Sequence, residues 1–186
     1  MKKTYVLDTN VLIQAPYAVE CFEENTVVLP MTVLEELDNM KKEEGEKGAN
    51  VRKVIRILDA HREKGNLLEG VRMEWGGTLR VEKNYRNVEL PPDLPEHKSD
   101  NRILKVCVGL SKEREEEVIL VTKDILLRIK AQLLGIQAED FGTEQVAVHE
   151  EQYLGRREVF VPEELFKEFK KKGVPVECVY CCDMSG

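Results

Sequence analysis

The sequence predicts an α/β fold from continuous apolar runs, from helical spacing between them and from the polar residues that follow each run. The runs are short and do not alternate: residues 4–7 (TYVL), 26–30 (TVVLP) and 117–122 (EVILVT). Such runs are typical of strands buried on both faces of a parallel sheet. Helices between them would form the layers that cover the sheet.

Apolar residues at three- and four-residue spacing predict the helices. The pattern begins at Val33, Val51, Ile103 and Ile125, and the last stretch stops near Gly135. Spacing of this kind places apolar side chains on one helix face, and glycine commonly ends a helix. Because strands and helices alternate along the chain, the predicted sheet is central, parallel and covered on both sides.

One segment between the helices reads as a hairpin. Apolar residues alternate in residues 71–75 and again in residues 78–82, on either side of Gly76-Gly77. This pattern predicts a tight hairpin, which we expect to be an insertion that projects from the sheet. Three prolines in residues 91–95 then predict an extended loop that leads to a helix starting near Ser99.

The character of the chain changes after Phe141-Gly142. Residues 157–162 read as a strand and residues 163–173 as a short amphipathic helix, which is too little for a core of its own. We therefore expect a main domain in residues 1–142 and a C-terminal extension or connector in residues 143–186.

The composition limits the partners that the chain can have. A formal charge of −7 argues against a broad basic face for nucleic acid, so any contact with a polyanion must be local. No secretory signal and no run of about 18 uncharged apolar residues is present. Five cysteines without framework spacing fit a reducing compartment, so we expect a cytoplasmic protein that does not enter a membrane.

The last three cysteines stand close together in the sequence. Cys178, Cys181 and Cys182 form a C-x-x-C-C group near the terminus. Two or three thiols could hold zinc only if another chain or a histidine supplied further ligands. Ordinary cysteines near a chain end are the alternative.

Acidic residues occupy the positions where a site would form. Asp8 follows the first predicted strand, Asp124 follows the third, and Asp100 opens a helix after the proline-rich loop. Glu36 lies in the first turns of the helix after residues 26–30. Ligand sites of parallel sheets lie beyond the carboxyl ends of the strands, so we expect the four acids to converge there.

Carboxylates without a histidine pair or a thiolate set suit hard ions such as Mg²⁺ or Mn²⁺. Repulsion among the acids makes a cation nearly obligatory. Two ions at such a site can activate a water and stabilise the leaving oxygen in phosphodiester hydrolysis. The competing interpretation is that Asp8, Ser99 or Asp100, and Asp124 only cap helices and that Glu36 is a surface residue.

These segments resemble the motifs of the PIN-domain nucleases. YVLDTNVLI resembles the first motif, VLPMTVLEELDNMK the second, SDNRIL the third and LVTKD the fourth, so the resemblance covers about residues 4–141. The residues of the first two motifs and of the hairpin look most like the amino-terminal PIN part of PhoH-like ATPases. No G-x-x-x-x-G-K-[ST] loop is present, because the nearest approach, residues 65–70, is followed by Val71.

The resemblance implies a three-layer α/β/α PIN-like fold and a Mg²⁺- or Mn²⁺-dependent endonuclease acting on single-stranded RNA, with DNA left open. A PhoH-like ATPase domain would be missing from this chain, and a homo-oligomer is compatible with the family. The implied roles fall on catalytic metal ligands (Asp8, Glu36, Asp100, Asp124) and on orienting residues (Asn10, Thr122), with Thr9 less certain. The alternatives are a non-catalytic nucleic-acid-binding or interaction module of such an ATPase, and a toxin-type PIN ribonuclease.

Three basic residues near the acids are candidates for contact with substrate phosphates. They are Arg102, Lys123 and Arg128. Arg128 lies one helical turn beyond Asp124, so it could instead pair with that carboxylate.

Overall fold

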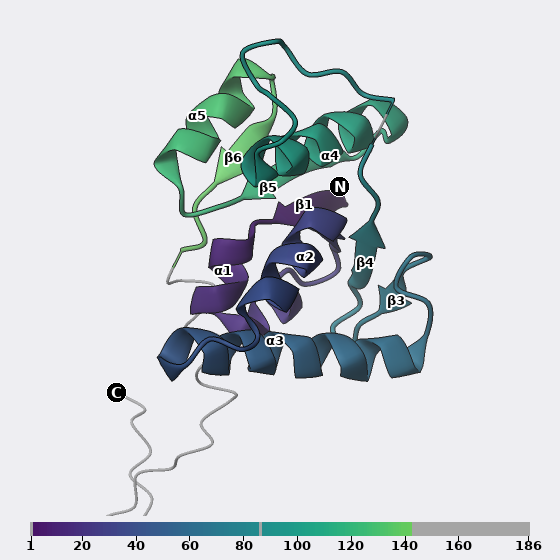
Figure 1. The fold of residues 1–186 in the computed structure, drawn as a ribbon. Coiled ribbons are helices and arrows are strands. Elements are labelled where there is room, and N and C mark those ends of the chain that lie inside the picture. Colours follow the sequence, from purple (N-terminus) through teal and green to yellow (C-terminus); the bar gives the residue numbers. More distant parts are fainter. Residues whose placement is uncertain (1, 86, 143–186) are drawn as a thin grey trace, which may run out of the picture. The chain divides into compact units, whose positions relative to one another are not determined.

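The computed structural model describes residues 2–85 and 87–142, and within them a six-stranded sheet forms the centre of the fold (Figure 1). The strand order is β3-β4-β2-β1-β5-β6. All neighbours are parallel except β3 and β4, which are antiparallel. The strands are β1 (Lys3–Leu7), β2 (Thr26–Pro30), β3 (Val71–Arg72), β4 (Thr78–Glu82), β5 (Glu117–Val121) and β6 (Gln137–Glu139).

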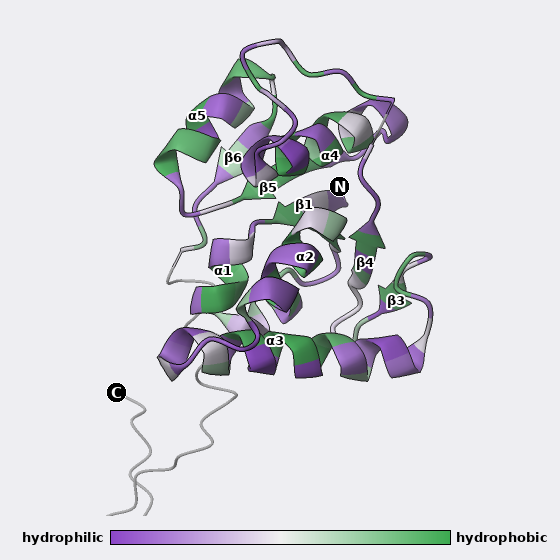
Figure 2. Cartoon of the chain, in the orientation of Figure 1, coloured by the Kyte–Doolittle hydropathy of each residue, from purple (hydrophilic) through white to green (hydrophobic). Residues whose placement is uncertain are grey.

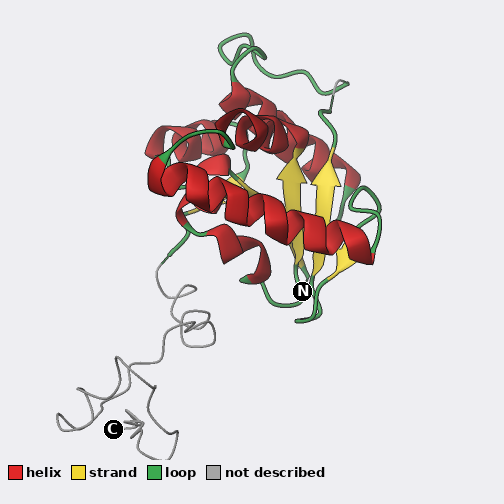
Figure 3. Cartoon of the chain, turned by 60° about the horizontal axis from the view of Figure 1, so that its bottom comes forward, coloured by secondary structure: helices red, strands yellow, loops and turns green. Residues whose placement is uncertain are grey.

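Helices lie on both sides of this sheet. Helices α1 and α3 cover one side and α4 and α5 the other, and α2 contacts both α3 and α4 (Figure 1). Figure 3 shows the longest of them, α3, lying across the sheet. The helices are α1 (Thr9–Gln14), a 3₁₀ turn η1 (Pro16–Glu20), α2 (Met31–Met40), α3 (Gly45–Lys64), α4 (Ser99–Glu113) and α5 (Ile125–Leu133).

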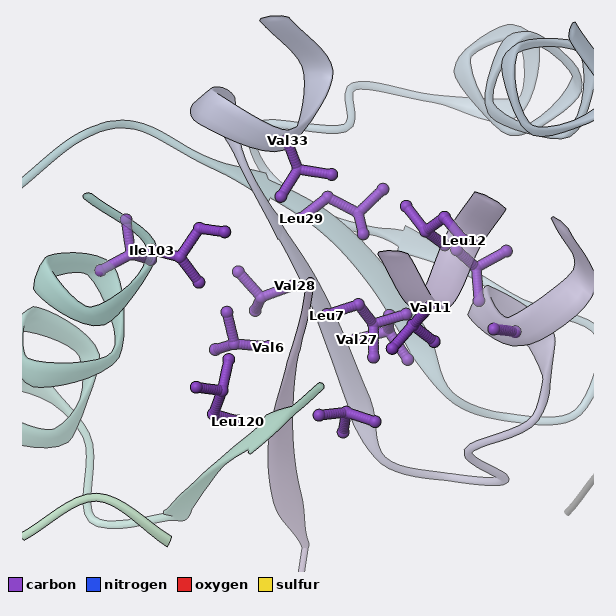
Figure 4. Close-up of a cluster of buried hydrophobic side chains, with 14 of the residues drawn as sticks. Val6, Leu7, Val11, Leu12, Val27, Val28, Leu29, Val33, Ile103 and Leu120 are labelled. Carbon is purple, nitrogen blue, oxygen red and sulfur yellow. The ribbon is translucent and has the colours of Figure 1, made fainter. Parts of the chain in front are cut away.

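The core forms because the strands bury apolar residues on both faces. Val6 is in register with Val28 on β2 and with Leu120 on β5, so the three share one face of the sheet. Figure 4 shows these three side chains directed towards Ile103 of α4. The next residue along β1, Leu7, points to the opposite side, where α1 packs. Both faces are therefore dry, as the continuous apolar runs predicted.

Helix α3 is amphipathic, with apolar residues interleaved among hydrophilic ones (Figure 2). Val51 and Val54 are buried in the core. Gly48 in its first turns is buried too, and a Cβ there would lie 1.8 Å from the backbone oxygen of Glu43. The segment that joins α2 to α3 can pass this close only because position 48 has no side chain.

The predicted α/β class and its layers are confirmed, and the strands and helices predicted within residues 4–135 are present in the predicted order. The expectation that the hairpin projects from the sheet is wrong. Strand β4 pairs in parallel with β2 along its whole length, so it belongs to the main sheet. The reversal is also longer than a tight turn at Gly76-Gly77, since Met73 N donates to Gly77 O at 2.8 Å.

The strand order reverses direction between β1 and β5. The chain leaves β1 towards β2 on one side, whereas it leaves β5 towards β6 on the other. The helices that follow these two strands, α1 and α5, lie on opposite faces (Figure 1), so the rim of the sheet at the carboxyl ends of β1 and β5 is the switch point where ligands of such sheets bind. This rim is where the predicted acids fall.

Some predictions concern parts of the chain outside the described residues. The C-terminal extension of residues 143–186, with Cys178, Cys181 and Cys182, lies there, so the domain boundary after residue 142 stays a prediction. Among the helices of the described ranges, none has the length and apolar content that crossing a membrane requires.

Candidate metal centre

Asp8 stands at the centre of the rim, directly after β1. Its side chain is buried, with 3% of the residue exposed. Its backbone N donates to Val121 O of β5 at 3.0 Å, which anchors the end of β1 beside β5. Burial raises the pKa of the Asp8 carboxyl, and hydrogen bonds from the Thr122 side chain and the Thr9 backbone oppose this rise. The charges of Glu36 and Asp100 raise the pKa further, so negative charge gathers here.

Thr122 links Asp8 to Asp124. Its Oγ1 donates to Asp8 Oδ2 at 2.8 Å and accepts a hydrogen bond from the backbone N of Asp124 at 3.1 Å. The residue is fully buried at the end of β5, and its own N donates to Glu139 O of β6. One hydroxyl therefore fixes the position of both acids relative to β5.

Asp124 caps helix α5 and follows the carboxyl end of β5. Its Oδ1 accepts from Leu126 N at 2.8 Å and from Leu127 N at 3.3 Å, which is an N-cap arrangement for α5. Its Oδ2 makes no hydrogen bond to the residues that the structure describes. Capping therefore uses Oδ1 and leaves Oδ2 available to another ligand.

Glu36 reaches the rim from α2. Its Oε2 accepts a short hydrogen bond from the hydroxyl of Thr9, which is buried in the first turn of α1. Helix α1 was not among the predicted helices, yet it brings Thr9 next to Asp8 and ties Glu36 to the same corner. The structure therefore gives Thr9 a definite contact that sequence reasoning left uncertain.

Asp100 lies in the first turn of α4 and forms an ion pair with Lys130 of α5, with 3.3 Å between Oδ2 and Nζ. The N-cap position of α4 is Lys98, and the Asp8 side chain makes no capping hydrogen bond at α1. The capping interpretation therefore applies to Asp124 but not to Asp8 or Asp100. Sequence reasoning missed Lys130, which lies between Ile129 and Leu133, two of the apolar residues that indicated the helix.

The three residues predicted to contact phosphates have different surroundings in the structure. Arg102 forms an ion pair with Glu35 at 3.1 Å, and Arg128 lies 4.0 Å from Asp140 instead of pairing with Asp124. Lys123 is exposed beside the rim. Asn10, predicted to orient the acids, is exposed in α1 and makes no side-chain hydrogen bond within residues 2–85 and 87–142.

The donor chemistry of these acids fits a hard divalent cation, because every donor is a carboxylate oxygen. Across the described ranges, however, no three acidic, histidine or cysteine side chains already stand close enough together to hold an ion. Binding would therefore have to draw the acids nearer to one another. The raised pKa of Asp8 indicates why a cation would favour this change.

Comparison with known protein families identifies the family of this chain. The family model of the PIN domain matches residues 5–142. The chain therefore belongs to the PIN-domain family, whose members are generally metal-dependent nucleases.

Its relatives include two proteins named PhoH2. The one from Bacillus subtilis is 46% identical over 178 residues, which is 92% of this chain and 40% of the relative. The one from Mycolicibacterium smegmatis is 40% identical over 149 residues, covering 78% of this chain and 34% of the relative. The chain thus spans about 40% of the length of the Bacillus relative.

Solved structures of similar proteins were also found. A domain of a functionally unknown protein from Methanocaldococcus jannaschii is 24% identical with a TM-score of 0.45, over 75% of this chain and 91% of that one. VapBC2 from Rickettsia felis, bound to a DNA fragment from its promoter, is 17% identical with a TM-score of 0.45. The match to VapBC2 covers 74% of this chain and 98% of that one.

Proposed function

We propose that residues 1–142 are a Mg²⁺- or Mn²⁺-dependent endonuclease that hydrolyses phosphodiester bonds in single-stranded RNA. The observation that carries this proposal is the buried Asp8 carboxyl. The charges of Glu36 and Asp100 oppose its ionisation, and the Thr122 hydroxyl links it to the backbone of Asp124. A carboxyl whose pKa is raised by burial and further by other acids needs a counter-charge, and membership of the PIN-domain family supports divalent cations as that charge.

Each side chain would have a separate task. Asp8, Glu36, Asp100 and Asp124 would hold the cation or cations, and Thr122 and Thr9 would keep Asp8 and Glu36 turned towards the rim. The bound cations would supply activation of the attacking water and stabilisation of the leaving oxygen. Lys123 and Arg102, beside the acids, are the candidates for holding neighbouring phosphates.

The charge of the chain supports a substrate that is bound locally. At a formal charge of −7, the protein has no excess of basic residues with which to hold a long duplex. A single strand can bend and present one phosphate to the rim, which favours single-stranded RNA. We further propose that this activity serves a PhoH-like ATPase, an idea supported by the PhoH2 relatives, which are longer than this chain.

Replacement of Asp8 by asparagine tests the proposal. Asp8→Asn keeps the shape of the side chain but removes its charge, so cleavage of a labelled single-stranded RNA in Mn²⁺ should fall at least roughly a hundredfold. Circular dichroism should show an unchanged fold. The matched control is Asp59→Asn, which removes an exposed carboxylate paired with Arg62 on α3 and should cut at the wild-type rate.

Cleavage by Asp8→Asn at the wild-type rate would reject the proposal. A DNA strand of the same sequence, assayed alongside, decides between RNA and DNA as the substrate.

A further inference from the structure

Lys130 is the basic side chain that touches the candidate metal centre. It extends from α5, its side chain is 27% exposed, and its Nζ lies 3.3 Å from Asp100 Oδ2. Among the residues that the structure describes, no other lysine or arginine is paired with Asp8, Glu36, Asp100 or Asp124. The other three acids receive hydrogen bonds from neutral hydroxyl or backbone N–H groups.

This difference matters because the ammonium group of Lys130 and a metal ion compete for the same carboxylate. A divalent ion that binds Asp100 must take an oxygen that now accepts from an ammonium, and it must do so beside a positive charge that repels it. Neutral donors such as the Thr122 hydroxyl exert no comparable repulsion. Asp100 is therefore the acid whose pairing has to change for an ion to bind all four.

We infer that Lys130 is the counter-ion of Asp100 in the metal-free centre and becomes a phosphate contact once a metal ion takes Asp100. This inference rests on the proposed function, because the phosphate belongs to the RNA strand. Lysine suits such an exchange, since its ammonium is a compact charge on a flexible four-carbon stem. The released ammonium of Lys130 would then lie near the metal ion. The RNA phosphate that the metal ion attracts is the anion with which this ammonium would pair.

The charges agree with this exchange. The four carboxylates and Lys130 together carry a formal charge of about −3, which two divalent ions would bring to about +1. One phosphodiester would then neutralise the centre. If Lys130 stayed on Asp100, the ions would lose one ligand and the phosphate would lose one positive partner.

Calorimetric titration with Mn²⁺ tests the first half. Lys130→Gln removes the competing charge, so Mn²⁺ should bind roughly three- to tenfold more tightly than to wild type. Lys130→Arg keeps the charge and should bind Mn²⁺ as wild type does. The matched control is Lys3→Gln, which breaks an ion pair of 3.2 Å between Lys3 and Glu117 at the amino-terminal ends of β1 and β5, away from the acids. It should leave Mn²⁺ affinity unchanged.

Mn²⁺ affinity of Lys130→Gln equal to or below that of wild type would overturn the counter-ion role. Thermal unfolding of each variant shows whether it is folded, and Lys130→Met, which also removes the charge, should show the same tighter binding of Mn²⁺ if the glutamine variant does not fold.

Binding of RNA tests the second half. Affinity for a cleavage-resistant phosphorothioate RNA in Mg²⁺ would be measured over a range of salt concentrations. Loss of one phosphate contact should reduce the slope of log affinity against log salt by about 0.7 in Lys130→Gln and not in Lys3→Gln. An unchanged slope would refute the phosphate contact.

These results separate the inference from the proposed function. If wild type binds and cuts RNA but the slope of Lys130→Gln does not change, only the inference fails. If wild type neither binds nor cuts RNA, the proposed function fails together with the phosphate contact, while the Mn²⁺ titration still decides the counter-ion role.

Discussion

The Thr122 hydroxyl has one proton and uses it for Asp8, while its oxygen accepts from the Asp124 backbone. Thr122→Val keeps the shape but leaves Asp8 and the Asp124 N–H without these partners in a buried place. We expect the free energy of unfolding to fall by about 1–3 kcal/mol, and Mn²⁺ to bind roughly ten- to a hundredfold more weakly. Chemical denaturation and calorimetry measure the two effects.

Thr122→Ser is the control for this prediction, because it keeps the hydroxyl and should bind Mn²⁺ nearly as wild type does. If valine and serine variants bind Mn²⁺ equally well, the hydroxyl does not position Asp8.

Single residues also show what the sequence could and could not predict about the site. Asp8 and Asp124 could be found because each follows a recognisable strand, and Asp100 because it opens a helix after prolines. Thr9 was harder, since α1 has six residues and too few turns to show helical spacing. Lys130 could not be found, because its partner lies 30 residues away and the contact exists only once α4 and α5 pack together.

Helix α3 depends on the close approach at Gly48. Alanine usually favours a helix over glycine, but here its Cβ would overlap the backbone oxygen of Glu43. We therefore expect Gly48→Ala to destabilise the protein by about 1–3 kcal/mol, because backbone would have to move to make room. Thermal or urea unfolding measures this loss.

The control for that substitution lies in the same chain. Gly142→Ala meets no atom within 4 Å and should change stability little. Equal stability of Gly48→Ala and wild type would show that the segment joining α2 to α3 yields without cost.

The position of strand β4 was predicted wrongly, as part of a hairpin that projects from the sheet. Its residues are alternately buried and half-exposed, a pattern that an isolated hairpin and a strand near a sheet edge share. Pairing of β4 with β2 joins segments about fifty residues apart, such as Thr26 and Thr78, and nothing local in the sequence specifies it. The continuous runs of β1, β2 and β5 had no such second interpretation, so their places in the sheet could be predicted.

The molecule as a whole should be less stable without metal than with it, and the difference should depend on pH. The folded-state pKa of Asp8 is raised, so the folded protein holds this proton more strongly than the unfolded chain does. The contribution of Asp8 to stability therefore falls as pH rises from the unfolded pKa through the raised one. Bound Mn²⁺ should offset this loss, so we expect it to raise the melting temperature more at about pH 7.5 than at about pH 5.

Scanning calorimetry in Mn²⁺ and in a chelator, at both pH values, checks this expectation. The Asp8→Asn protein should melt at a temperature that responds far less to Mn²⁺. A wild-type melting temperature that is the same with Mn²⁺ and with chelator at both pH values would contradict it.

The hydrogen bond between Thr122 and Asp8 joins positions 114 residues apart, and Lys130 lies still later in the chain. During synthesis on the ribosome, the first carboxylate emerges long before the strand that fixes it. The growing polypeptide therefore cannot assemble the proposed metal centre until the residues through Thr122 have been made. The proposed nuclease activity would accordingly appear late in the synthesis of this domain.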